Sequence, residues 1–221
     1  MTGTPFPFHA LEPDLLGAFP AVDATALIHV LDPLPVEHAS CAPGERAAAV
    51  LALLKPGPQG PELLLVRRAL DMEEHAGQIA LPGGRVDGED ATPGATALRE
   101  AWEETGLPPG QVQLLGALNM LVVPVSRHRV VPVVGWLKGE VELHARTAET
   151  AELWYTPLRE LRQVARPVEL RGFPAWEFPL PGARVWGMTA LVLGDLLGRL
   201  GLLPMRNAVE ASAGFGPNTD R

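Results

Sequence analysis

Cysteine, lysine and long apolar runs are scarce in this chain, and each shortage narrows what the protein can be. Cys41 is the only cysteine among 221 residues, so no disulfide can form within the chain, which fits a reducing compartment. The only lysines are Lys55 and Lys138, so arginine supplies nearly all the basic side chains. No apolar run reaches the roughly 18–20 residues that a membrane span needs. Residues 1–10 also lack a basic segment followed by an apolar stretch, so we expect no membrane anchor, no secretory signal and a cytoplasmic protein.

An excess of positive charge is missing as well. The formal net charge is −8 at pH 7. Broad nucleic-acid binding draws on a basic surface, so we expect no nucleic-acid partner. A small anionic ligand is still compatible with this charge, because local arginines and a bound metal ion can reverse the sign of the field. The length and the hydrophobic fraction of 47% predict one globular domain with appendages.

The composition divides the chain into three parts. Residues 1–45 are rich in proline and lack clear periodicity, which predicts an N-terminal arm with one short helix over 14–19. Residues 46–204 carry the apolar segments of a folded domain. Residues 205–221 are small and polar and contain glycine, which predicts a mobile tail.

Short apolar segments within the domain predict strands and one long helix. The first two strands flank a proline–glycine turn and should form a hairpin. The helix is expected to begin at Trp186, which we place in the core, and to run to about Leu200. The predicted strands are 47–54, 62–68, 111–118, 130–137 and, at a sheet edge, 140–143.

A glycine turn followed by an acidic helix occupies the middle of the chain. Thr92 can cap this helix, and Pro93 suits its first position, because an N–H there would have no partner within the helix. Gly106 supplies the left-handed residue that ends it. The helix therefore has clear sequence signals at both ends.

Three glutamates, Glu100, Glu103 and Glu104, share one face of this helix, because helical neighbours lie three and four residues apart. They repel one another, and none lies in the first turn, where the helix dipole favours acids. A divalent cation would relieve this repulsion, and hard oxygen ligands suit Mg²⁺ or Mn²⁺. The alternative is an acidic face that simply meets solvent. The side expected against the core comprises Ala97, Leu98, Ala101, Trp102 and Thr105.

At these residues the chain resembles the Nudix hydrolase family. The family signature is Gly, five residues, Glu, seven residues, then Arg-Glu-apolar-x-Glu-Glu-x-Gly-apolar. Two departures occur: the first acidic position is Asp90, and one extra residue separates it from Arg99. The matching positions are Gly84, Arg99, Glu100, Ala101, Glu103, Glu104, Gly106 and Leu107.

The resemblance implies an α+β fold, namely a Nudix-type α/β/α sandwich with a mixed central sheet and a catalytic strand-loop-helix. It also implies hydrolysis of a phosphoanhydride that depends on Mg²⁺ or Mn²⁺. Glu100 and Glu104 are the expected principal metal ligands, with Glu103 in support and the Gly84 carbonyl completing the set. Arg99 is expected to orient a glutamate through a charge-assisted hydrogen bond.

The general base is left open among Glu100, Glu103 and Glu149. Glu149 begins a segment that resembles the one after the last loop of Nudix folds, where an acidic residue can lie near the metals. Glu152 is the second candidate in that segment. Ordinary surface charge or a helix cap explains either residue equally well.

Four basic side chains are candidates for substrate binding. Arg67 and Arg68 emerge at the end of a predicted strand, and Arg127 and His128 occupy a loop between two strands. Arginine binds phosphate through two parallel hydrogen bonds. A solvated strand end and an exposed hairpin tip are the competing interpretations.

The hint about the substrate lies before the glycine turn, where the chain resembles the coenzyme A pyrophosphatase branch of the family. That motif runs Leu-Leu-Thr-x-Arg-Ser/Ala, three residues, Arg, three residues, Gly, three residues, Phe-Pro-Gly-Gly. Val66 and Leu81 are mild departures, but Glu73 replaces an arginine and reverses its charge. The matching positions are Leu64, Leu65, Arg68, Ala69, Gly77, Pro82, Gly83 and Gly84.

This second resemblance implies cleavage of coenzyme A to 3′,5′-ADP and 4′-phosphopantetheine. Because of Glu73, the alternative is another nucleoside diphosphate derivative, such as ADP-ribose, or a dinucleoside polyphosphate. A non-catalytic nucleotide-binding module is the third hypothesis. In each case the expected partner is a small nucleotide, and since Nudix proteins are often dimers, a homodimer is a further expectation.

Overall fold

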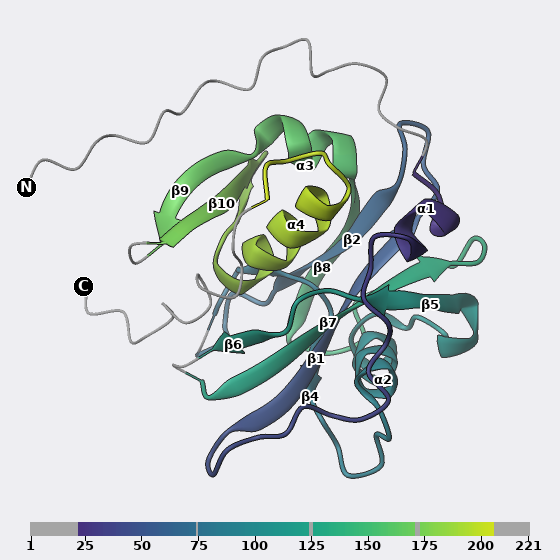
Figure 1. Ribbon diagram of the computed structural model, residues 1–221, viewed down its shortest axis with the longest axis vertical. Helices are drawn as coiled ribbons and strands as arrows, with labels where there is room; N and C mark the ends of the chain where they lie inside the picture. The colour runs from purple at the N-terminus through teal and green to yellow at the C-terminus, as the bar shows by residue number, and fades with distance from the viewer. Residues whose placement is uncertain (1–21, 74, 124–125, 171–172, 206–221) are drawn as a thin grey trace, which may run out of the picture.

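A mixed sheet forms the centre of the computed structural model, which describes residues 22–73, 75–123, 126–170 and 173–205 (Figure 1). Its eight strands in these residues are β1 (Arg46–Lys55), β2 (Glu62–Arg68), β3 (Ile79–Ala80), β4 (Gly83–Arg85), β5 (Val112–Ala117), β6 (Leu121–Val123), β7 (His128–Leu137) and β8 (Thr150–Pro157). The strand order is β3-β2-β1-β7-β5, while β4 pairs with β1, β6 with β7 and β8 with β2. β1 and β7 run parallel, and the other pairs are antiparallel. The predicted hairpin of the first two strands is confirmed.

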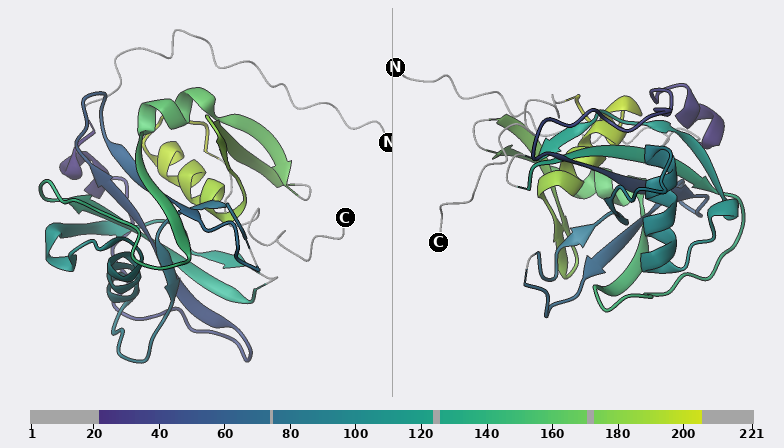
Figure 2. Two further views of the ribbon diagram at one scale, coloured as in Figure 1. Left: turned by 180° about the vertical axis from the view of Figure 1, so that it is seen from behind. Right: turned by 90° about the horizontal axis from the view of Figure 1, so that it is seen from below.

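Helices cover both faces of this sheet. They are α1 (Ala24–Ile28), α2 (Pro93–Thr105), α3 (Leu158–Val164) and α4 (Gly187–Arg199), and a short 3₁₀ helix spans Pro109–Gln111. A second sheet of three strands comprises β9 (Arg166–Leu170), β10 (Phe173–Leu180) and β11 (Ala183–Val185). α2 packs on one face of the central sheet, and α3, α4 and the small sheet pack on the other (Figure 2).

Alternation along β1 produces two separate cores, because successive side chains of a strand point to opposite faces. Ala49, Leu51 and Leu53 pack with Ala97 of α2. The β1 residues between them join the larger core, to which α3 and α4 contribute. Nearly the whole of β1 is therefore buried on both sides. The α/β/α sandwich with a mixed sheet, predicted from the sequence, is confirmed.

The ends of α2 match the sequence signals. The Thr92 hydroxyl accepts a hydrogen bond from the Ala95 N–H at 3.1 Å, and Gly106 ends the helix with φ +75°. One prediction about its faces is wrong: Trp102 is 43% exposed and is not part of the core. Its ring lies 4.5 Å from the guanidinium carbon of Arg146, in a cation–π contact that covers an apolar side chain without burying it.

The N-terminal segment from residue 22 to 45 is bound along the domain. Leu27 of α1 is fully buried in the larger core. Asp32 forms a two-bond backbone bridge with Ala117, and the His38 imidazole lies 2.7 Å from the Asp90 carbonyl oxygen. The predicted helix over 14–19 and nearly all of the predicted tail lie outside the described residues.

Two further sequence predictions are corrected by the structure. Residues 140–143 form no strand, although they are well within the described part of the chain. They belong to an irregular segment that continues to the C-terminal end of α2, where the N–H groups of His144 and Arg146 bind the carbonyls of Thr105 and Glu104. Trp186 precedes α4 and is 40% exposed, so its predicted core position is wrong.

The length and hydropathy of the helices bear on membrane insertion. Every helix in the described part of the chain falls short of what a bilayer-spanning segment requires.

Candidate active site

The glycine turn packs tightly against β1 and lies next to the Glu100 carboxyl group of α2. Gly83 and Gly84 of β4 pair with Val50 and Ala49 of β1. A Cβ atom added to Gly84 would lie 2.5 Å from the Glu100 carboxyl group, and one added to Gly83 would collide with the Ala49 carbonyl. The Glu100 and Glu104 carboxylates therefore lie against the backbone of the two glycines.

Arg99 connects the acidic residues of this region. Its Nη2 donates to Asp90 Oδ2 at 2.9 Å and to the Arg85 carbonyl at 2.8 Å. Its Nη1 lies 3.0 Å from Glu100 Oε1 and 3.3 Å from Glu103 Oε2. The guanidinium thus fixes the start of α2 to the turn and holds two glutamates of the acidic face.

Asp90 has a site role that the sequence analysis did not assign. Its side chain is 6% exposed. Burial alone would raise the pKa of Asp90, but hydrogen bonds from Arg99 and from the Asp87 N–H hold that pKa below its ordinary value. The same Asp90 carboxylate raises the pKa of Arg99. The signal was available, because Asp90 occupies the first acidic position of the Nudix signature.

Glu100 and Glu104 lie next to each other in a poorly solvated place. Burial raises the pKa of Glu104 to about 7, and the charges of Glu100 and Glu149 contribute in the same direction against a hydrogen bond from the Gly83 N–H. That bond, to Glu104 Oε2, measures 3.3 Å. Burial also raises the pKa of Glu100, against the opposing charge of Arg99. Two partly buried carboxylates with raised pKa values form a place where a cation would be bound favourably.

The oxygen atoms of Glu100, Glu104 and Gly84 are of the type that binds a hard divalent cation. They do not, however, surround a single point. Carboxylate and carbonyl oxygens are the ligands that such ions prefer. In residues 22–73, 75–123, 126–170 and 173–205, no three acidic, histidine or cysteine side chains converge as a ready metal cluster. Glu103 is 44% exposed and turned toward Arg99. Glu100 and Glu104, beside the Gly84 backbone, are thus the residues best placed to hold such an ion.

The structure separates the two arginines at the end of β2. Arg68 lies 3.7 Å from Glu149, and both residues act on the charge of Glu104, so Arg68 faces α2. Arg67 lies on the other face, where it contacts Glu152 at 3.4 Å and the Gly182 carbonyl at 3.2 Å. Neighbouring strand residues point to opposite faces. Of these two arginines, Arg68 lies on the side of Glu104 and Glu149. Arg67 and Glu152 lie away from them.

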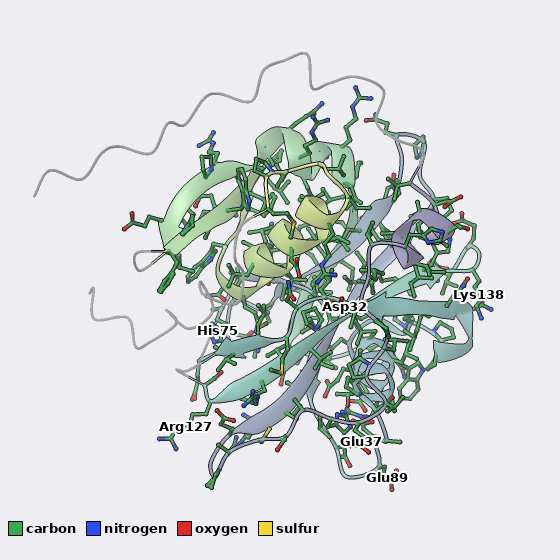
Figure 3. All side chains as sticks on the ribbon, in the orientation of Figure 1. Asp32, Glu37, His75, Glu89, Arg127 and Lys138 are labelled. Carbon is green, nitrogen blue, oxygen red and sulfur yellow. The ribbon has the colours of Figure 1, made fainter. Side chains whose placement is uncertain are left out.

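The remaining predicted residues, Arg127 and His128, lie at the start of β7. His128 is aligned with Arg46 of β1, at the end of the sheet and away from the α2 glutamates. Arg127 is exposed and points outward at the tip of the β6–β7 hairpin (Figure 3). Burial lowers the pKa of His128, and the nearby guanidinium groups of Arg85 and Arg46 lower it further.

Known proteins resemble this chain in sequence over most of its length. The Nudix domain family model matches residues 45–176. An uncharacterized Nudix hydrolase, NudL, of Klebsiella pneumoniae is 38% identical over 188 residues, which cover 82% of this chain and 95% of that protein. NudL of Pectobacterium atrosepticum is 40% identical over 161 residues, covering 69% of this chain and 81% of that protein.

Two solved structures are similar to about half of this chain. The Nudix hydrolase RenU of M. smegmatis is 26% identical, with a TM-score of 0.45 over 54% of this chain and 74% of that one. The Ap4A hydrolase of C. elegans is 19% identical, with a TM-score of 0.44 over 51% of this chain and 80% of that one. The family model and the NudL relatives, together with the glycine turn and the glutamate helix described above, identify the chain as a member of the Nudix hydrolase family.

Proposed function

We propose that this Nudix hydrolase cleaves the phosphoanhydride of coenzyme A or of an acyl-CoA, giving 3′,5′-ADP and 4′-phosphopantetheine or its acylated form. The main support comes from the segment that resembles the coenzyme A branch, because backbone hydrogen bonds fold it back onto β2. The Arg68 N–H donates to the Gln78 carbonyl at 2.9 Å, and the Gly77 N–H donates to the Ala69 carbonyl at 3.3 Å. The loop is thereby closed on β2, next to the glycine turn, with Arg68 facing Glu104.

Each acidic residue of α2 has a distinct proposed role. Glu100 and Glu104 would together hold a divalent cation, Mg²⁺ or Mn²⁺, with the Gly84 carbonyl and with Glu103 in support. When bound, this ion supplies neutralisation of charge on the phosphoryl oxygens and a lower pKa for the attacking water. Arg99 positions Glu100 and Glu103 through its bonds at 3.0 and 3.3 Å.

Arg68 and Glu149 complete the proposed machinery. The Arg68 guanidinium donates hydrogen bonds to a phosphoryl oxygen of the anhydride, a task that suits its planar fork. The base that takes the proton of the attacking water is one of Glu100, Glu103 and Glu149. Glu149 is 64% exposed and lies beside Arg68, so it can reach solvent and substrate together. We place this machinery in a domain of residues 46–204, with residues 22–45 bound along it.

A substrate panel tests the proposal. Coenzyme A, acetyl-CoA, ADP-ribose, diadenosine tetraphosphate and dATP are each incubated with Mg²⁺ and with Mn²⁺, and the products are identified by mass. We expect coenzyme A or acetyl-CoA to be preferred by about ten-fold or more. Glu104→Gln should abolish turnover, while Glu169→Gln, an exposed glutamate on β9, should not change it. No turnover of coenzyme A or acetyl-CoA with either metal would refute the coenzyme A assignment.

One observation favours a second candidate, hydrolysis of ADP-ribose or a dinucleoside polyphosphate. Glu73, where the coenzyme A branch has arginine, is exposed in the loop between β2 and β3. A carboxylate there disfavours an additional phosphate group, which ADP-ribose lacks. The same panel distinguishes the two, since this candidate requires ADP-ribose or diadenosine tetraphosphate to lead. Binding of every compound without turnover at saturating metal would instead identify a nucleotide-binding module.

A further inference from the structure

A group of basic residues lies at one end of the central sheet, on the face opposite α2. Arg46 and His128 are aligned neighbours on β1 and β7, and Arg85 of β4 is aligned with Ala48, two residues further along β1. Aligned neighbours in a sheet point to the same face. Ala48 belongs to the core on the side of α4, so Arg46, Arg85 and His128 share that face.

These arginines differ from most others in the described residues because they have no carboxylate partner there. Glu45, the acid next to Arg46, is occupied by Arg129 at 3.2 Å and by the Ala42 N–H at 2.9 Å. Figure 3 shows Glu37 and Glu89 on the side of α2, away from the outward-pointing Arg127. The arginines that do contact carboxylates in this part of the chain are Arg67, Arg68, Arg99, Arg129, Arg184 and Arg199.

An unbalanced positive cluster is notable in a chain whose net charge is −8. Arg46 and Arg85 are exposed, and the strand register brings them close to His128. After the effect of burial, both guanidinium groups also lower the pKa of His128. Like charges held together on a strand face destabilise it, so the arrangement lowers stability unless an anion binds there. Solvated strand ends would instead be spread apart.

The cluster begins one residue from the proposed catalytic turn. Arg85 follows Gly84 directly, and the Arg85 carbonyl accepts a hydrogen bond from Arg99 at 2.8 Å. From β4 across β1 to β7 the strands span about 10 Å, since neighbouring strands lie about 4.8 Å apart. The basic residues therefore begin beside the glycine turn and extend about 10 Å across the sheet, on the face opposite α2.

We propose that Arg46, Arg85 and His128, flanked by Arg127, form a binding site for a phosphate monoester of the substrate that is not cleaved. The inference rests on the proposed function, in which this group is the 3′-phosphate of coenzyme A. Two guanidinium groups and an imidazole match a phosphate dianion in charge and in hydrogen-bond donors. The site supplies from other strands the positive charge that Glu73 removes from the loop between β2 and β3.

Nucleotide binding tests this site without depending on turnover. The affinities of 3′,5′-ADP and of 5′-AMP, which lacks the 3′-phosphate, are measured by calorimetry for the wild type, Arg46→Gln and Arg85→Gln. The wild type should bind 3′,5′-ADP about ten-fold more tightly than 5′-AMP, and each variant should lose most of that preference. Arg166→Gln, an exposed arginine of β9, is the matched control and should keep it. Equal binding of the two nucleotides by the wild type, or an unchanged preference in both variants, overturns the proposal.

The kinetic counterpart separates this inference from the proposed function. The ratio of kcat/KM for coenzyme A to that for 3′-dephospho-CoA should fall about ten-fold in Arg46→Gln and stay constant in Arg166→Gln. Turnover of coenzyme A with an unchanged ratio in Arg46→Gln would refute the phosphate site and leave the proposed function standing. Absence of coenzyme A turnover, with a preference for 3′,5′-ADP that depends on Arg46, would refute the function and support the site.

Discussion

The helices α2 and α4 have the same length and lie on opposite faces of the sheet. They differ in how far their charged side chains are buried and paired. Each spans 13 residues and carries an arginine paired with a carboxylate four residues away. α4 buries every residue from Thr189 to Gly198, whereas α2 buries only a stripe and leaves its acidic side open. The helices therefore differ in how completely their charges are matched.

On α4 the buried charges are fully matched. Asp195 accepts hydrogen bonds from the Asn119 N–H at 3.0 Å and from Arg199 Nε at 3.1 Å. Arg199 also donates to the Val30 carbonyl at 3.1 Å and to Asp32 Oδ2 at 2.8 Å. The network ties the N-terminal segment and the loop after β5 to α4, and its role is structural.

On α2 the carboxylates have too few hydrogen-bond donors and basic partners to match their charge, so they can still bind a cation. Glu104 accepts one long hydrogen bond from Gly83, and burial raises its pKa to about 7. Among the residues that the structure describes, Arg99 is the basic side chain that pairs with Glu100, at 3.0 Å. A desolvated carboxylate with too few hydrogen-bond donors or basic partners lowers stability, and a bound cation would offset that cost. Local charge balance therefore distinguishes the proposed site from a structural ion pair.

The largest predicted effect breaks the matched network on α4. Asp195→Ala should lower the free energy of unfolding by about 3–5 kcal/mol, because Arg199, whose side chain is 15% exposed, loses its buried partner. Asp32→Ala is the control, since Asp32 is 57% exposed and its pair should contribute less than about 1 kcal/mol. Urea unfolding measures both. Equal losses in the two variants would contradict the idea that α4 carries a buried structural pair.

The second prediction concerns pH and the unmatched carboxylate on α2. Glu104 keeps its proton to about pH 7 in the folded chain, against an ordinary value of 4.5. Because the folded chain holds this proton more tightly than the unfolded chain, the free energy of unfolding is highest below pH 4.5. It should fall by about 3 kcal/mol as the pH rises from 4.5 to 7. Unfolding of chelator-treated protein across this range, compared with Glu104→Gln, measures it. A wild type and variant with parallel pH profiles would show that Glu104 is well solvated.

The third prediction sharpens the role of Arg99. Arg99→Lys keeps the charge but cannot hold Asp90, Glu100 and Glu103 at once, so kcat should fall by about 10–100-fold with little loss of stability. Steady-state kinetics with the preferred substrate measures this, and Arg166→Lys on β9 is the control. A full retention of kcat in Arg99→Lys would mean that the charge alone, and not the fork of hydrogen bonds, positions the glutamates.

The smallest predicted effect comes from the exposed side of α2. Trp102→Ala removes a cation–π contact with Arg146 and should cost about 1 kcal/mol or less. Trp176 in the α4 core is 5% exposed, and Trp176→Ala should cost about 3–5 kcal/mol. Thermal unfolding compares the two. A large loss in Trp102→Ala would place that ring in a core that the structure does not show.

Much of the fold could be predicted because its signals are local. Apolar runs predicted β1, β2, β5 and β7, and a threonine, a proline and a glycine predicted the ends of α2. The strand predicted at 140–143 is absent because those residues lie in an irregular segment, whose following residues His144 and Arg146 bind carbonyls at the end of α2. The core positions predicted for Trp102 and Trp186 were wrong, because hydrophobicity alone does not show whether a neighbouring element will cover a ring.

The sequence by itself determined the family, the helix that carries the glutamates and the glycines that let it approach the sheet, because these depend on short spacing along the chain. The grouping of the basic residues, in contrast, depended on tertiary structure. Arg68 faces Glu104 while its neighbour Arg67 faces the opposite side, and Arg46, Arg85 and His128 come together from three strands. The physical reason is that sheet register and strand alternation fix side-chain neighbours across many residues of sequence, and neither can be read from one strand alone.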